Sequence, residues 1–320
     1  MADANVARTL ATETKEPNKL GGFLKKLFRH HPLGAFGLVI TVSFLLTAVF
    51  AETIAPYDMN ASDIKRRLQP PSREFLLGTD LIGRDMFSRI IIGTRTSLTI
   101  GLAAAAGSVV IALVMGILSA YLGGFVDMAV QRFVDAWMCI PGLSILLVIV
   151  SITGTSIPAM IFILSLGGIV GSRLIRSTVI RIREDMYLAA ATAIGSGTLR
   201  ILLRHVLPNI LAPTIVAFTG SVPGMILAEA GLSFLGFGLG PPTPSWGAML
   251  SGQVRFHMFE APHLVIWPGV ALGLVVYGTN MFGDALRDIL DPRLRGGGGR
   301  FSGTAAQRKQ QQKPADAGKR

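Results

Sequence analysis

The sequence predicts an all-α membrane protein with about six transmembrane helices. Half of its 320 residues are hydrophobic and only 15% are charged, whereas soluble domains carry about 25% charged residues. Six segments are long and apolar enough to cross a bilayer core of about 30 Å, which takes about 20 residues of helix. None of them alternates like a strand, and a spanning segment must satisfy its own backbone hydrogen bonds, so we expect a helix for each.

The predicted spans are residues 33–56, 97–122, 131–153, 157–177, 210–236 and 262–286. The first is too long for the hydrophobic part of a signal peptide and follows a polar segment, so we expect it to be retained. In the third, the single cysteine, Cys139, is expected to be a small buried side chain. Within the fifth, Pro213 and Pro223 predict a kink or a re-entrant end.

Three regions follow from this division: a basic N-terminal segment (1–31), a transmembrane domain (32–296) and a tail (297–320). Residues 21–31 alternate apolar and basic side chains, which predicts a short helix on the cytoplasmic membrane surface or a solvated basic flank. Residues 1–20 and the tail lack an apolar pattern, so we expect both to be disordered.

Charged connecting segments predict the orientation in the cytoplasmic membrane. Lysine and arginine gather before the first span, between the fourth and fifth, and after the sixth, so both termini and residues 184–209 are predicted to be cytoplasmic. Residues 57–96 are also basic but contain five acidic residues. This segment is long enough to fold as an ordered cap, and we place it on the outer side.

The sequence argues against several other functions. The net charge of +11 lies at the ends and in connecting segments, which fits membrane lipids and not nucleic acid. No G-x-x-x-x-G-K-[ST] phosphate loop and no G-x-S-x-G motif is present. The five histidines and one cysteine have no metal-ligand spacing. We therefore expect no catalytic residue, metal site or cofactor in this chain, which cannot by itself harvest nucleotide energy.

Residues 184–209 carry the most informative pattern, EDMYLAAATAIGSGTLRILLRHVLPN. Two acids and a run of alanines predict a helix that can lie close to another surface, and glycines then break it. A second amphipathic helix follows, which we expect proline to end. The unit could dock into a groove on a soluble partner, or it could be an ordinary amphipathic connector. The residues expected to carry coupling are Tyr187, Ala189, Ala190, Ala191, Gly195, Arg204, His205, Leu207 and Pro208.

This segment resembles the "EAA" loop of permease subunits of bacterial ABC importers. Ala190, Ala191 and Gly195 fall on the family pattern, as does the closing Leu207-Pro208 pair. Ala189 stands where the family has an acid, so the contact that this acid makes is absent here. The apolar docking face is retained.

Three further stretches resemble one branch of that family, the permeases for dipeptides, oligopeptides, nickel and glutathione, and most closely its "C"-type subunit. They are residues 76–98, 228–250 and 280–296, and they follow in the same order along the chain. The resemblance implies the type I ABC importer permease fold, with residues 184–209 as the coupling segment. It also implies a sister permease, two cytoplasmic ATPases that bind ATP and magnesium, and an extracytoplasmic solute-binding protein. Peptides are the expected substrate, with nickel and glutathione as alternatives.

Two features near the predicted outer side have alternative interpretations. Glu229, with Ser233 nearby, lies in an apolar context, where a carboxylate contacts the substrate, forms a gate or pairs locally. The stiff loop with Pro241, Pro242 and Trp246 could face the receptor protein or anchor the chain at the membrane surface.

Charged residues lie at the ends of several predicted spans. Those at 127–135 are predicted to pair locally at the interface. Arg173 and Arg176 are predicted to reach the lipid headgroups. The charges at 284–288 are predicted to pair with the helices of residues 184–209.

Two rival functions remain. A secondary transporter driven by an ion gradient needs ionisable groups within the membrane, and Glu229 is one candidate. Such transporters often contain inverted repeats, and no repeat is evident here. A membrane-embedded assembly protein is the second rival.

Overall fold

The computed structural model describes residues 19–290, and within this range the secondary structure is helical, with one isolated β-bridge between Thr79 and Asp85. The predicted disorder at the two ends falls outside this range, except that residues 19 and 20 begin the first described helix.

Six membrane crossings are present when each bent helix pair is counted as one span, as predicted. Four described helices are long and apolar enough to cross alone: α3 (Pro32–Val49), α5 (Met86–Leu122), the run Thr198–Phe237 and α14 (His263–Leu290). Two further crossings are pairs: α6 (Gly124–Met138) with α7 (Gly142–Thr153), and α8 (Ile157–Ser165) with α9 (Gly168–Arg183). The chain is therefore a multi-pass membrane protein.

Shorter elements connect these spans. The run Thr198–Phe237 is made of α11 (Thr198–Ile201), a π-helical turn (Leu202–Val206), α12 (Leu207–Leu232) and a second π-helical turn (Ser233–Phe237). The others are α2 (Lys19–His30), α4 (Ala51–Ile54), α10 (Met186–Ala193), α13 (Trp246–Met249) and the 3-10 helices Ile64–Arg66 and Gly252–Phe256.

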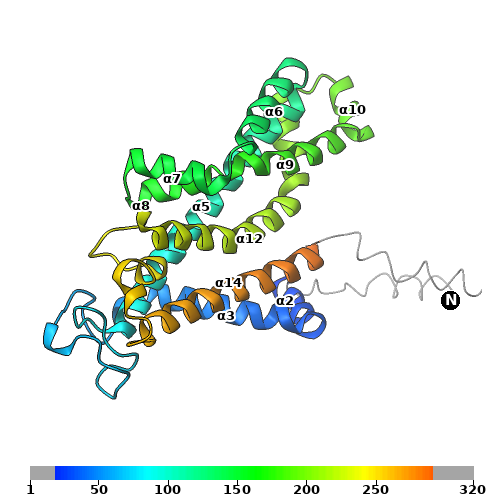
Figure 1. Ribbon diagram of the computed structural model, residues 1–320. Coiled ribbons are helices and arrows are strands. Elements are labelled where there is room, and N and C mark those ends of the chain that lie inside the picture. The colour runs from blue at the N-terminus through cyan, green and yellow to red at the C-terminus, as the bar shows by residue number, and fades with distance from the viewer. Residues whose placement is uncertain (1–18, 291–320) are drawn as a thin grey trace, which may run out of the picture.

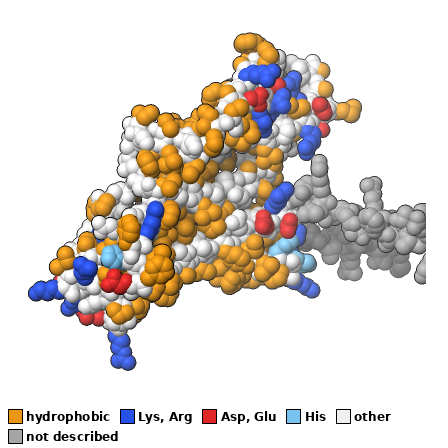
Figure 2. Space-filling view, viewed as in Figure 1, with side chains coloured by type: hydrophobic (Ala, Val, Ile, Leu, Met, Phe, Trp, Pro, Cys, Tyr) orange, Lys and Arg blue, Asp and Glu red, His pale blue; other side chains and the backbone are white. Residues whose placement is uncertain are grey.

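The spanning helices alternate in direction (Figure 1). As a result α2, α10 and the end of α14 lie on one side of the molecule, and the irregular segment of residues 55–85 lies at the opposite end. Figure 2 shows hydrophobic side chains over the middle of the molecule and most charged side chains towards its ends. This distribution fits a bilayer around the middle and water or headgroups at both ends.

The second span begins at Met86 and not at residue 97, so the predicted cap of residues 57–96 ends at residue 85. Asp85 caps this helix, because its carboxylate accepts the Ser88 backbone N–H at 2.8 Å. Basic residues in the first turns suggested a loop, but Arg89 pairs with Asp80 in the structure. The Arg89–Asp80 ion pair compensates the charge of Arg89, so the helix can start within a charged stretch.

The third and fourth predicted spans are broken. Helices α6 and α7 meet at 90°, and α8 and α9 meet at 42°. The first break lies between Met138 and Gly142, where Pro141 precedes α7 and cannot donate a backbone hydrogen bond. Cys139 lies in this break and is exposed, so the expectation that it is buried is wrong.

The charges on α6 pair mainly with α9. Arg176 Nε donates to Asp127 Oδ1 at 2.6 Å, and Arg173 pairs with Asp135. The predicted local pair also exists in part, with Arg132 at 3.7 Å from Asp135. Acids on the neighbouring helix hold both guanidinium groups, a pairing that was not predicted, and contact of Arg173 and Arg176 with lipid headgroups stays a prediction.

Proline does not end the helix after residue 206, as we expected it to. The run Thr198–Phe237 continues through Pro208, which lies in the first turn of α12. The π-helical turn before it widens the backbone spiral, and the Leu207 N–H bonds back to the Leu202 carbonyl. Pro213 and Pro223 also lie inside α12. The second part of residues 184–209 is thus continuous with a membrane span.

Helix α5 is the centre of the bundle and packs on α3, α8, α9 and α12. Glycines allow the closest approaches. A Cβ added at Gly168 at the start of α9 would lie 2.0 Å from the Ser108 carbonyl oxygen on α5. At Gly220 on α12, by contrast, a Cβ would meet nothing within 4 Å.

These two glycines make a matched pair for testing the packing of α5 on α9. Gly168→Ala should lower the free energy of unfolding by about 1–3 kcal/mol, because backbone has to move to admit the methyl group. Gly220→Ala should leave it unchanged or raise it, since alanine favours helix by about 1 kcal/mol over glycine. Detergent titration of the two purified full-length variants measures both. Equal stability of the two variants would contradict the close contact.

Candidate functional site

Residues 184–209 form an elbow at the end of the bundle opposite to the cap (Figure 1). Helix α10 ends at Ala193, and Gly195 follows with a φ of +80°. This left-handed conformation favours glycine and turns the chain before α11 begins at Thr198. The predicted helix, glycine break and second helix are therefore all present.

One face of the elbow holds it against the bundle. Leu188 and Ala191 of α10 are buried, as are Ile201 and Val206 further along. Leu188, Ile201 and Val206 join one hydrophobic cluster with residues of α5 and α9. Among the predicted coupling residues, Ala191 is on the buried side of α10.

The opposite face of the elbow is apolar and uncovered by any described residue. Ala189 and Ala190 are exposed. Large apolar side chains surround them: Met186 is 89% exposed, Ile194 83% and Leu199 68%. Contiguous exposed apolar surface is typical of a site of protein interaction. The replacement of the family acid by Ala189 leaves this face without charge at that position.

A hollow of about 750 Å³ lies beside the glycine turn, lined by Gly195, Gly197, Leu199, Arg200, Leu203 and Arg204. Within residues 19–290 neither Arg200 nor Arg204 has an acidic partner. The hollow therefore combines apolar and basic side chains, which complement a surface that carries apolar and acidic side chains.

Tyr187 links α10 directly to the first turn of α12. Its hydroxyl accepts a hydrogen bond from Asn209 Nδ2 at 3.1 Å, and its ring lies 6.1 Å from that of His205. Burial, and next the charge of Asp185, raise the pKa of the Tyr187 hydroxyl above its ordinary value, so it stays neutral. These contacts connect α10 to the start of α12. Of the remaining predicted residues, Leu207 is half-buried here and Pro208 is exposed.

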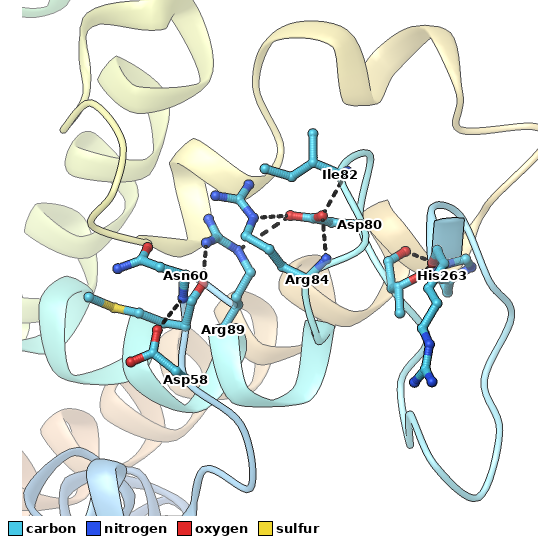
Figure 3. A network of polar contacts seen from close by, with 10 residues as sticks. Asp58, Asn60, Asp80, Ile82, Arg84, Arg89 and His263 are labelled. Carbon is cyan, nitrogen blue, oxygen red and sulfur yellow. Dashed lines mark hydrogen bonds and ion pairs between the residues drawn. The ribbon is translucent and has the colours of Figure 1, made fainter. Parts of the chain in front are cut away.

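At the other end of the molecule, a network around Asp80 orders the cap (Figure 3). Asp80 accepts from the backbone N–H groups of Ile82 at 3.0 Å and Arg84 at 2.9 Å, and from Arg84 Nε at 2.6 Å. Arg89 adds a contact at 3.7 Å, and His263 lies 3.1 Å from the Thr79 carbonyl oxygen. These contacts tie the cap to the first turns of α5 and α14.

The loop predicted to face the receptor is only partly exposed. Pro241 and Pro242 are exposed. Trp246 is fully buried, donates from Nε1 to the Ile90 carbonyl oxygen at 3.3 Å and packs edge-on against Phe44. Both predicted roles for Trp246, receptor contact and membrane anchor, are therefore wrong. It instead fastens α13 to α5 and α3.

Glu229 and Ser233 are also buried. Glu229 accepts a hydrogen bond from the Ser233 hydroxyl at 2.7 Å and another from Ser97 at 3.4 Å. Ser97 in turn accepts the Trp246 backbone N–H at 3.2 Å. The predicted alternative of pairing within the chain is observed, and contact with substrate or a gate stays a prediction.

Substitution at Glu229 distinguishes these two roles. Glu229→Ala should destabilise the chain by about 1–3 kcal/mol, because buried hydroxyl groups lose their partner. Glu229→Gln retains acceptor capacity and should cost less. Detergent unfolding measures stability, and uptake kinetics at several substrate concentrations provide the control. A Gln variant that is equally stable but has a changed substrate KM would contradict the structural role.

The charges that end α14 do not pair with the elbow. Among the described residues, Asp288 instead lies 3.7 Å from His31 Nδ1, at the junction of α2 and α3. The prediction of ion pairs from residues 284–288 to residues 184–209 is therefore wrong. The N-terminal helix predicted for residues 21–31 is present as α2, with Leu27 fully buried against α14.

Sequence reasoning missed several residues of this site. Met186 and Ile194 are its most exposed apolar side chains, and their position on either side of the alanine run was an available signal. Ser97 gave no such signal, because its partner Glu229 lies 132 positions away in the sequence.

Two known protein families match parts of this chain. Residues 108–296 match the family described as the inner membrane component of binding-protein-dependent transport systems. Residues 25–71 match the N-terminal transmembrane domain of oligopeptide transport permease C.

Individual relatives match over most of their length. The chain is 40% identical over 271 residues to the dipeptide transport system permease protein DppC of Alkalihalophilus pseudofirmus, covering 84% of this chain and 89% of that one. It is 38% identical to a putative peptide transport system permease protein of Brucella abortus, with coverage of 85% and 91%. It is 35% identical to the glutathione transport system permease protein GsiD of Pectobacterium atrosepticum, again with coverage of 85% and 91%. With its six crossings and its elbow between the fourth and fifth, the chain belongs to the family of inner membrane components of binding-protein-dependent transport systems.

Proposed function

We propose that this chain is the permease subunit of an ATP-driven importer and that it forms a path for peptides with a sister permease. The observation that carries this proposal is the uncovered apolar elbow, continuous with a membrane span. Relatives named for dipeptide and peptide transport support the substrate class. Glutathione, after which another relative is named, is itself a small peptide.

The proposed complex contains, besides this chain, a sister permease, two ATPases and a solute-binding protein. Two cytoplasmic ATPases bind ATP and magnesium and dock on the elbows, so this chain needs no catalytic residue or cofactor. An extracytoplasmic binding protein delivers solute to the cap side, where Pro241 and Pro242 remain exposed. Both termini and the elbow lie in the cytoplasm, and the spans lie in the inner membrane.

The elbow converts movement of the ATPases into movement of α12. When ATP closes the ATPases, the groove that holds α10 moves, and α10 moves with it. The Tyr187–Asn209 hydrogen bond and the continuous run Thr198–Phe237 carry the displacement into the bilayer. ATP shifts the balance of inward-open and outward-open states only because the ATPases contact the two states differently.

Reconstitution of the complete transporter in vesicles tests this function. With binding protein and labelled dipeptide outside and ATP inside, uptake should require ATP and should resist a protonophore. Uptake that survives ATP depletion and collapses with the protonophore would establish the secondary transporter instead. Purification of the chain without any ATPase or sister permease would favour the assembly protein.

A further inference from the structure

A second concave surface lies at the elbow end of the bundle, between α9, α12 and α14. This inner groove has a volume of about 580 Å³ and is lined by Leu174, Ser177, Thr178, Arg181, Ala212, Pro213, Val216, Ala217, Arg287 and Leu290. It does not share a residue with the elbow hollow.

The charge in the inner groove is entirely positive. Arg181 lies in the last turn of α9, and Arg287 in the last turn of α14. Within the described part of the chain neither has an ion pair. Asp284, one turn before Arg287, is exposed and does not line the groove. Two unpaired guanidinium groups at one site favour an anion that offers several oxygens.

The walls of the inner groove are apolar and lie on helices that cross the bilayer. They consist of Leu174, Ala212, Pro213, Val216 and Ala217, all on spanning helices. Outside the groove the same helices expose further large apolar side chains: Leu211 is 50% exposed and Ile215 is 43% exposed. A ligand here therefore meets arginines at the water-facing end and apolar surface deeper in the bundle.

We infer that the inner groove binds an acidic phospholipid of the cytoplasmic leaflet, with its phosphate between Arg181 and Arg287 and an acyl chain along α12. Basic pockets between spanning helices on the cytoplasmic side bind such headgroups. A lipid seated here fills the space between α9, α12 and α14, and α12 is the helix that continues from the elbow. The site thus makes the coupling helix sensitive to the surrounding lipid.

Native mass spectrometry of the full-length chain tests this inference with phosphatidylglycerol and, as the neutral comparison, phosphatidylcholine of the same acyl chains. The wild type should retain phosphatidylglycerol preferentially. Arg181→Gln with Arg287→Gln should weaken it about thirtyfold, since each basic residue near a headgroup contributes about 1 kcal/mol. Ala217→Trp, which fills the groove and keeps both arginines, should also remove the bound lipid.

Lys25→Gln with Arg29→Gln is the matched control, because it removes two exposed charges from α2 at the same end of the molecule. This variant should retain the lipid. Equal retention of both lipids by the wild type, or wild-type retention by the arginine variant, would overturn the inference. So would displacement by inorganic phosphate, or cross-links from a photoreactive group at residue 217 to residues 291–320 or to a sister permease.

Discussion

Ala190→Glu should lower ATP-driven peptide uptake by about a hundredfold or more. The residue lies on the uncovered face of α10, so docking on an ATPase would bury the new carboxylate without a partner. An uncompensated buried charge costs about 3 kcal/mol or more, and about 1.4 kcal/mol corresponds to a tenfold change. Peptide uptake and ATP hydrolysis are measured together in vesicles that contain the complete transporter. The amount of peptide taken up for each ATP hydrolysed should fall, because hydrolysis no longer drives transport.

Ala190→Ser is the matched control for this experiment, since it is small and uncharged. It should transport at close to the wild-type rate. Both variants should unfold like the wild type, because substitution of an exposed residue changes stability by about 0.5 kcal/mol or less. Hydrolysis that remains fully coupled to uptake in Ala190→Glu would refute the docking assignment.

Trp246→Ala should lower the free energy of unfolding by about 3–5 kcal/mol, as expected when a large buried aromatic side chain is removed. Trp246 is fully buried, and its Nε1 donates to the Ile90 carbonyl oxygen. It also packs against Phe44, with ring centroids 5.7 Å apart at 85°. Loss of the side chain leaves a cavity between α3, α5 and α13. Titration of the purified full-length chain with denaturing detergent measures the change.

Two further variants show whether packing is the cause. Trp246→Phe keeps most of the apolar volume and should cost less than half as much as Trp246→Ala. Phe259→Ala removes an aromatic side chain that is 88% exposed, so it should leave stability nearly unchanged. An alanine variant at 246 that is as stable as the wild type but takes up peptide poorly would instead restore the receptor-facing role.

Hydropathy predicted the number of crossings because a bilayer imposes one length on every span. It did not predict the 90° bend between α6 and α7. Residues 139–141 continue the apolar pattern, although the helix is interrupted there. The starts of α5 and α6 were also placed too late. Their first turns carry charges that look like loop residues, but Asp80 of the cap pairs with Arg89, and Arg176 of α9 pairs with Asp127.

The elbow was more predictable than the outer side. Its alanines, Gly195 and flanking acids are local signals, and local backbone preferences decide the break between α10 and α11. The partners of Glu229 and Trp246 were not predicted, because their surroundings come from distant segments. Ser97 forms a hydrogen bond with each of them, although it lies 132 positions from Glu229. Spacing along the sequence does not indicate such a contact.

Coupling requires that the elbow lie in the cytoplasm, in contact with a separate ATPase. Cysteine labelling tests this directly, because Cys139 is the only cysteine in the chain and can be removed as Cys139→Ser. Ile194, 83% exposed beside the glycine turn, is then changed to Cys. A membrane-impermeant maleimide should label residue 194 in inside-out vesicles, and bound ATPase subunits should protect it. Labelling from the outside of intact cells, or labelling that bound ATPases do not affect, would contradict the account.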